Sequence, residues 1–254
     1  MDTHCHLDTD VFSGDVEDVL DGARDAGVRA FVNVGFNPDT WASTIVLAQR
    51  HPDVNFALGL HPQDAKLWSR PTVNTLTRLI EEHRPVAIGE IGIDLFRGET
   101  NLDQQRLAFC DQLDLALAHR LPVIIHMRSA QSEVLETLVS REVNPRLLFH
   151  SFEGTEELTT FVAEHGSMVG IGGLATRSKS VTIRQQLEHI PLTHMVLETD
   201  SPYLVPAKTK GSRNTPMAIP KIAHVLSDLK SISLATVAAE TTRNAETFFG
   251  RLGL

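Results

Sequence analysis

Eight short apolar stretches, each followed by a helical pattern, constrain this chain more than any other feature. After a first stretch at the N-terminus, the others occupy residues 30–34, 55–60, 85–91, 122–126, 146–150, 168–171 and 195–197. Continuous apolar runs of this length are typical of parallel strands covered on both faces. Helical patterns lie at residues 16–26, 39–49, 73–82, 102–119, 131–140, 156–164, 180–188, 216–228 and 234–249. The alternation predicts an α/β fold, a single (β/α)8 TIM barrel.

The length agrees with one such barrel. A (β/α)8 barrel commonly needs roughly 250 residues, and this chain has 254. No linker-like or repetitive segment divides it, so we expect one domain over residues 1–254. The alternative is an open doubly wound sheet, but no glycine-rich dinucleotide fingerprint follows the first strand.

The composition is that of a globular protein with a sizeable core, with 42% hydrophobic and 22% charged residues. No apolar run approaches the ~20 residues of a membrane helix, and no signal-peptide pattern is present. A net charge of −9 argues against a non-specific nucleic-acid coat but allows a local phosphate site. The two cysteines provide no disulfide framework. This cysteine usage favours a reduced, cytoplasmic setting. We also expect a monomer without membrane contact.

Histidines and carboxylates recur where the predicted strands end. His4 and His6 flank Cys5, so both imidazoles point to the same face of an extended strand. Further polar residues stand at the ends of later strands: His61, Glu90, His126, His150 and Asp200. In a (β/α)8 barrel these ends meet at one rim, which carries the active site. Because unpaired polar groups are costly to bury, the convergence indicates a metal site.

The number of ligands predicts two metal ions. Four imidazoles and two carboxylates are too many for one tetrahedral ion and suit two ions that share a carboxylate. Glu90 is the expected bridge. The other ligands divide into His4, His6 and Asp200 on one ion, and His126 and His150 on the other. This donor set favours Zn, Mn, Fe or Ni over Ca, while Mg fits where substrate phosphate adds oxygens. We expect two divalent cations, with Zn, Mn or Mg as the candidates.

Several motifs resemble the signature blocks of the TatD-type metal-dependent hydrolases, which are deoxyribonucleases. They are Asp2-Thr3-His4-Cys5-His6, Gly59-Leu60-His61-Pro62, Gly89-Glu90-Ile91-Gly92-Ile93-Asp94, residues 122–126, residues 198–204 and Arg213-Asn214. The resemblance covers essentially the whole chain. It implies a TIM barrel, two divalent metals and hydrolysis of phosphodiester bonds in DNA. By position it implies the same six ligands: His4, His6, Glu90, His126, His150 and Asp200.

Three positions depart from the family pattern. The family often has His-Cys-Phe-Ser-Gly after the sixth strand, whereas this chain has a serine at 151 and Glu153 in place of the later serine. An aromatic residue often follows Gly-Leu-Asp directly, whereas here Leu95 precedes Phe96. Arg-Asn-Glu-Pro is common in the late loop, whereas here Thr215 replaces the acid. These changes leave the ligands intact and concern the substrate-facing loops.

The expected chemistry is metal-assisted hydrolysis at phosphorus. A water held between the ions would lose its proton near neutral pH, and the bridging hydroxide would attack. Asp200 would accept that proton as general base, or act as a ligand alone, and Glu90 is the second catalytic candidate. Four residues are candidate contacts to DNA or a nucleotide: His61, Arg128, Arg213 and Asn214. The alternative is a histidine that fixes the turn after the third strand for His61, a surface salt bridge for Arg128, and solvated loop charge for Arg213 and Asn214.

Two other functions fit parts of the pattern. A binuclear amidohydrolase would act on an amide, ester or small phosphoester, but such sites often bridge their metals with a carboxylated lysine where this chain has Glu90. A metal-storing or DNA-binding module is disfavoured by the acidic composition. A barrel opening with a single phosphate-binding site favours exonuclease-like action at the ends of a DNA strand.

Overall fold

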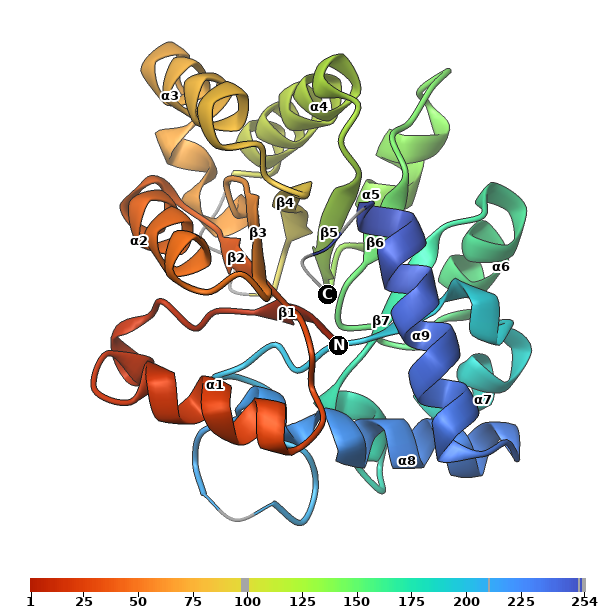
Figure 1. Cartoon of the computed structure of the whole chain (residues 1–254). Helices are drawn as coiled ribbons and strands as arrows, with labels where there is room; N and C mark the ends of the chain where they lie inside the picture. Colours follow the sequence, from red (N-terminus) through yellow and green to blue (C-terminus); the bar gives the residue numbers. More distant parts are fainter. Residues whose placement is uncertain (97–100, 210, 251, 253–254) are drawn as a thin grey trace.

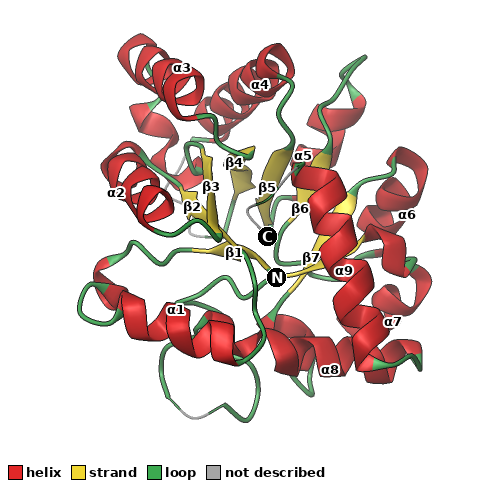
Figure 2. Cartoon of the chain, viewed as in Figure 1, coloured by secondary structure: helices red, strands yellow, loops and turns green. Residues whose placement is uncertain are grey.

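In the computed structural model of the chain, which describes residues 1–96, 101–209, 211–250 and 252, eight parallel strands pair in chain order (Figure 1). The strands are β1 (Asp2–Cys5), β2 (Phe31–Gly35), β3 (Val54–Leu58), β4 (Ala87–Asp94), β5 (Val123–Arg128), β6 (Leu147–Phe149), β7 (Met168–Ile171) and β8 (Met195–Leu197). The helices lie around them (Figure 2). They are α1 (Val16–Asp25), α2 (Pro38–Arg50), α3 (Arg70–His83), α4 (Leu102–His119), α5 (Gln131–Val139), α6 (Glu156–His165), α7 (Val181–His189), α8 (Ile219–Lys230) and α9 (Leu234–Phe249). The predicted (β/α)8 barrel is confirmed.

Backbone hydrogen bonds join the end of the barrel to its beginning. Just beyond β8, Ser201 forms a parallel bridge with Cys5. The His6 N–H donates to the Ser201 carbonyl at 2.8 Å, and the Asp200 N–H donates to the His4 carbonyl at 2.8 Å. This closure brings Asp200 beside the first histidines of the chain.

Two apolar clusters build the core on the two faces of the strands. Along β5, Val123 and Ile125 belong to a large cluster that includes residues of the surrounding helices. Ile124 belongs to a smaller cluster with inward residues of five other strands and with Phe248 and Phe249 of α9. This alternation is expected of strands that are buried on both faces.

Helix α9 covers the amino end of the barrel. Its Asn244 donates hydrogen bonds of 2.8 Å to the carbonyls of Leu192 and Met195, where β8 begins. In Figure 1 this helix passes across the strands on the side where the chain starts. The carboxyl ends of the strands are left for the functional site.

The register shifts in two strands at the positions of candidate ligands. Between β1 and β2 the shift falls within Asp2–Cys5, which contains His4. Between β4 and β5 it falls within Ile88–Ile91, which contains Glu90. An extra residue in a strand re-aims the side chains around it. The shifts therefore change the direction of the side chains near His4 and Glu90, so that these can point to the rim while their neighbours pack in the core.

No single described helix is long and apolar enough to cross a membrane. Within the described residues one pair of helices, Pro216–Lys230 and Leu234–Phe249, meets the criteria of length and composition together, and this pair is bent by 109°.

Candidate active site

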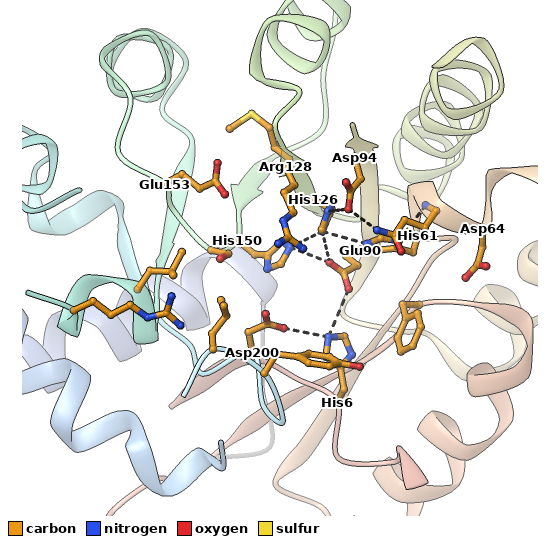
Figure 3. Close-up of a pocket in the computed structure, with 18 residues that line it drawn as sticks. His6, His61, Asp64, Glu90, Asp94, His126, Arg128, His150, Glu153 and Asp200 are labelled. Carbon is orange, nitrogen blue, oxygen red and sulfur yellow. Dashed lines mark hydrogen bonds and ion pairs between the residues drawn. The ribbon is translucent and has the colours of Figure 1, made fainter. Parts of the chain in front are cut away.

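Six side chains that the sequence singles out meet at the carboxyl end of the barrel, and Figure 3 shows five of them around one pocket. The strands or the residues just after them carry all six: His4 in β1, His6 after it, Glu90 in β4, His126 in β5, His150 after β6 and Asp200 after β8. Their side chains are buried or nearly so. The convergence expected from the sequence is therefore present in the fold.

The Glu90 carboxylate lies at the centre of this group, with each oxygen facing a different pair of imidazoles. Its Oε1 is 3.5 Å from His6 Nε2 and 3.8 Å from His4 Nε2. Its Oε2 is 2.9 Å from His150 Nε2 and 3.0 Å from His126 Nδ1. Burial alone would raise the pKa of Glu90, but the imidazoles, His150 foremost, hold it well below its usual range. Glu90 is thus an ionised carboxylate that lies between two pairs of imidazoles.

Asp200 completes the side of the site formed by the first strand. Its Oδ1 lies 3.4 Å from His6 Nε2 and 3.9 Å from His4 Nε2. Its backbone has a φ of 54°, in the left-handed region that non-glycine residues rarely adopt. Burial favours the neutral acid, but the hydrogen bond with His6 and the neighbouring imidazoles lower the pKa of Asp200 below its usual value. The carboxylate is therefore available as a ligand or a proton acceptor.

Hydrogen bonds on the far side of two imidazoles fix how they face the site. His6 Nδ1 lies 2.9 Å from the Val34 carbonyl, which can only accept, so this nitrogen carries a proton. His126 Nε2 lies 3.2 Å from Asp94 Oδ2, which also accepts from Gln63 Nε2 at 2.8 Å. His6 Nε2 and His126 Nδ1 are therefore the atoms that face the site. Such outer partners orient metal-binding histidines and set their tautomers.

The same contacts set the protonation of the imidazoles. Burial lowers the pKa of His6, but the Asp200 hydrogen bond and the charges of Glu90 and Asp200 outweigh it and raise the pKa to about 9. Hydrogen bonds to Asp94 and Glu90 likewise overcome burial and raise the pKa of His126 to about 9. Burial lowers the pKa of His4 to about 4, so this imidazole is neutral. At neutral pH, His6 and His126 of the metal-free site therefore carry protons that a bound cation would replace.

The donor atoms fit divalent metal ions. His4 Nε2 and His6 Nε2 lie 3.2 Å apart, and His126 Nδ1 and His150 Nε2 lie 3.1 Å apart. Ligand atoms lie within 4.8 Å of one another in three groups: His4 with His6 and Glu90, His4 with His150 and Asp200, and His61 with Glu90 and His126. Nitrogens and carboxylate oxygens that converge in this way suit a cation. The prediction of a metal site thus has a geometric basis.

His61 faces the same pocket but presents a proton to it. It lies beyond β3 at the start of a short 3-10 helix, and its Nδ1 accepts a hydrogen bond of 3.1 Å from the Gln63 N–H. The proton of the neutral ring therefore sits on Nε2, which is 3.3 Å from His126 Nδ1. Burial and the charge of His126 lower the pKa of His61 to about 3. An N–H donor in this position suits an anionic oxygen.

The pocket above these residues has a volume of about 420 Å³. Arg128, the last residue of β5, lies in its wall, as does Arg177, which follows β7. Apolar and aromatic walls come from Phe36 and Tyr203, among others. Cations beside aromatic surface suit an anionic ligand with a flat, apolar part.

Two predicted substrate contacts, Arg213 and Asn214, are not brought into this pocket. Arg213 forms hydrogen bonds of 3.0 and 2.5 Å with the two oxygens of Asp15, and its Nη1 also donates to the Val11 carbonyl at 2.8 Å. Asn214 is buried, and its Nδ2 donates to the Thr199 carbonyl at 2.8 Å. Both side chains hold the loop after β8, a structural role that differs from the solvated loop charge considered as their alternative.

The sequence reasoning missed three residues that shape the pocket. Arg177 has no motif around it, and the signal that could have found it is its place after the seventh strand, since every strand end contributes to the rim. Gln63 supports Asp94 and follows the noted Gly-Leu-His-Pro block by one residue. Glu153 lines the pocket and was noted only as a departure from the family pattern.

Comparisons with known proteins agree with this geometry. The profile of the family described as TatD related DNase matches residues 1–250. A relative from Pantoea ananatis, named 3'-5' ssDNA/RNA exonuclease TatD, is 34% identical, and the match covers 98% of this chain and 99% of the relative. The crystal structure of the TatD homologue YjjV from Escherichia coli K12 is 30% identical with a TM-score of 0.93, covering 98% of this chain and 97% of that one. YjjV carries the name of a metal-dependent hydrolase. The predicted resemblance is confirmed: the chain belongs to the TatD-related DNase family.

Proposed function

We propose that the chain is a divalent-metal-dependent nuclease that hydrolyses phosphodiester bonds in DNA from strand ends. The Glu90 carboxylate carries this proposal, because its two oxygens face two separate pairs of imidazoles. Relatives from Pantoea ananatis and Escherichia coli named 3'-5' ssDNA/RNA exonuclease support the substrate class.

The proposed cofactors are two cations, with Zn, Mn or Mg as the candidates. His4, His6 and Asp200 would hold one, His126 and His150 the other, and Glu90 would lie between them. Bound ions of this kind acidify water and neutralise charge that develops on phosphate oxygens. Asp94 and the Val34 carbonyl would keep the imidazoles in orientation, as partners outside the ligands do in metal sites.

The remaining roles follow from proton positions and charge. The Asp200 carboxylate is ionised and lies on the pocket wall, so it can accept the proton of an attacking water as general base. The Nε2–H of His61 and the guanidinium of Arg128 would donate to phosphate oxygens. These donors would neutralise the substrate on the side of the pocket formed by β3 to β5.

Hydrolysis of an amide, ester or small phosphoester is the alternative, since a pair of ions serves those reactions too. Glu90 stands where amidohydrolases of this kind often carry a carboxylated lysine, and this favours the phosphodiester. The expectations of one domain over residues 1–254, a monomeric state and a cytoplasmic location stay predictions.

The test is hydrolysis of a 5′-labelled single-stranded DNA by metal-stripped protein to which Mg, Mn or Zn is returned. We expect metal-dependent shortening from the 3′ end and its loss in Glu90→Ala, by on the order of a thousandfold, because the proposed site loses a ligand to both ions. Glu82→Ala is the matched control, since Glu82 is exposed on α3 and, within the described part of the chain, forms its ion pairs with Arg78 and His83 of the same helix. Bound metal without cleavage by any ion would contradict the nuclease and direct the search to amide or ester substrates.

A further inference from the structure

The guanidinium of Arg128 is held by the face of an aromatic ring. Its Cζ atom lies 3.8 Å from the centre of the Phe96 ring. Among the ion pairs of the described residues, none involves Arg128, so no carboxylate oxygen there lies within 4.0 Å of its nitrogens. A cation over an aromatic face is attracted by the ring without using its N–H groups. The hydrogen-bonding edge of Arg128 is therefore left for another partner.

The ends of β4 and β5 bring the ring to this place. Asp94 pairs with Arg128 in the ladder, and the Leu95 N–H donates to the Arg128 carbonyl at 3.0 Å. The Phe96 N–H then donates to Asp94 Oδ1 at 2.9 Å, which turns the chain back towards β5. Leu95 is the residue that separates the aromatic position from Asp94 in this chain. In this chain the aromatic residue at position 96 thus lies against Arg128.

Phe96 itself does not belong to the pocket wall, whereas Arg128 does. The ring is 59% exposed, so it contributes little to the core. Figure 3 shows Arg128 on the same side of the pocket as His126 and His150. The Phe96 N–H bonds Asp94, which also lines the pocket, but a change of the Phe96 side chain leaves that backbone bond in place. The ring itself therefore acts on the pocket through Arg128.

We propose that Phe96 is a positioning residue that holds Arg128 for a phosphate of the nucleic-acid strand. The ring fixes the plane of the guanidinium, and the free N–H edge donates to phosphate oxygens inside the pocket. This inference rests on the proposed function, since it names the residue that prepares the phosphate contact of that site.

The contact should act on binding more than on the chemical step. Among the described residues Arg128 forms no ion pair with Glu90 or Asp200, so its guanidinium belongs to the pocket wall and not to the group of side chains proposed to hold the metals. An interaction that is equal in the ground state and the transition state changes KM and leaves kcat unchanged. We therefore expect the effect of Phe96 in KM.

The experiment is a double-mutant cycle on the metal-loaded chain, with the 5′-labelled single-stranded DNA as substrate. Arg128→Ala should raise KM by about tenfold or more, the effect of losing a charged hydrogen bond. Phe96→Leu keeps an apolar side chain but removes the ring, and should raise KM by about two- to fivefold with kcat unchanged. Phe96→Trp keeps an aromatic face and should retain the wild-type KM. In the Arg128→Ala background, Phe96→Leu should have no further effect.

Anisotropy of a labelled oligonucleotide with the metal-stripped chain provides a readout without turnover. We expect the wild type and Phe96→Trp to bind most tightly, Phe96→Leu less tightly and Arg128→Ala least. The slope of log affinity against log salt concentration should be shallower in Arg128→Ala by about one phosphate contact. Unchanged KM and affinity in Phe96→Leu would overturn the inference, as would an undiminished effect of Phe96→Leu in the Arg128→Ala background. A wild-type chain that binds DNA without cleaving it would contradict the proposed activity alone, and the anisotropy series would still decide the role of Phe96. A chain that does not bind DNA would overturn both.

Discussion

Two arginines, Arg128 and Arg213, both stack on an aromatic ring but differ in the partners of their N–H groups. Arg128 is held from its face by Phe96, and its N–H edge is left towards the pocket. Arg213 lies over the Phe12 ring at 4.7 Å, but its edge is occupied by Asp15 and the Val11 carbonyl. An arginine can serve a ligand only with N–H groups that the fold has not already used. The comparison teaches that the partner of a side chain decides its role more than its type does.

The contrast extends to the segments that carry these arginines. The side formed by β4 and β5 presents Glu90, His126 and Arg128 to the pocket. In the loop after β8, by contrast, Asn214 bonds to nearby backbone groups. Its Nδ2 donates to the Thr199 carbonyl, and its Oδ1 accepts from the Thr215 N–H at 3.0 Å. The first side can bind a ligand, and the second supports the segment that carries Asp200.

The largest expected effect is a pH dependence of metal affinity, which the residues of the pocket should cause and the Asp15–Arg213 pair should not. His6 and His126, with pKa values of about 9, hold protons that a metal ion must displace, whereas Asp15 has a lowered pKa and Arg213 a raised one and both stay charged. The affinity for each ion should therefore rise by up to about tenfold per pH unit below pH 9, and the combined affinity for the two ions by about a hundredfold, because each ion displaces one of these protons. Calorimetric titrations between about pH 6.5 and 8.5, in buffers of different ionisation enthalpy, count the protons released.

The same raised pKa values have a consequence for the metal-free chain. They contribute stability that is fully present below the unfolded pKa of about 6.5 and is lost as pH rises through about 9. Metal binding without release of protons, or a metal-free chain that gains stability over this range, would contradict the assignment.

The next effect concerns the carboxylate that supports each side. Asp94→Asn removes the anionic acceptor of His126 Nε2, so metal affinity should fall by about ten- to a hundredfold. Asp15→Asn removes the partner of Arg213 and should leave metal affinity within about twofold, because Asp15 lies outside the pocket. Metal titrations of the two variants check this, and equal losses would remove the distinction between the sides.

Replacement of each arginine by alanine gives the third prediction. Arg128→Ala should raise KM for single-stranded DNA by about tenfold or more, whereas Arg213→Ala should change KM by less than about twofold, since its N–H groups are already used. Steady-state kinetics on one labelled oligonucleotide measure both. A rise of KM in Arg213→Ala as large as that in Arg128→Ala would restore the loop after β8 as a substrate contact.

The smallest effect on activity, and a clear one on stability, belongs to Asn214. Asn214→Ala leaves the buried Thr199 carbonyl without its donor, so the free energy of unfolding should fall by about 1–3 kcal/mol. Urea unfolding of the metal-free chain measures this. Asn55→Ala is a milder control, because Asn55 is half-buried and donates one long bond of 3.4 Å to the Phe31 carbonyl. A fall in kcat without loss of stability would argue for a direct role in the site.

The sequence by itself determined the barrel and the residues that meet at its rim. Short apolar strands and amphipathic helices have local periods that are visible in the sequence, and parallel strands of a barrel share one carboxyl edge. Any polar residue at a strand end must therefore approach that rim, and this is why His4, Glu90 and Asp200 could be grouped from positions far apart. The family resemblance reached the same group from its motifs.

Only the tertiary structure decided how these groups face one another. The grouping of four imidazoles into two pairs around Glu90 was expected from the sequence, but which oxygen of Glu90 faces each pair was not. The register shifts in β1 and β4 interrupt the regular alternation from which side-chain directions are predicted. The partner of Arg213 is Asp15, at the other end of the chain, and Arg128 meets the ring of Phe96. Hydrogen bonds and ring contacts depend on distances between atoms across the fold. Local sequence specifies which groups are present, and the packed chain determines which of them remain free to bind.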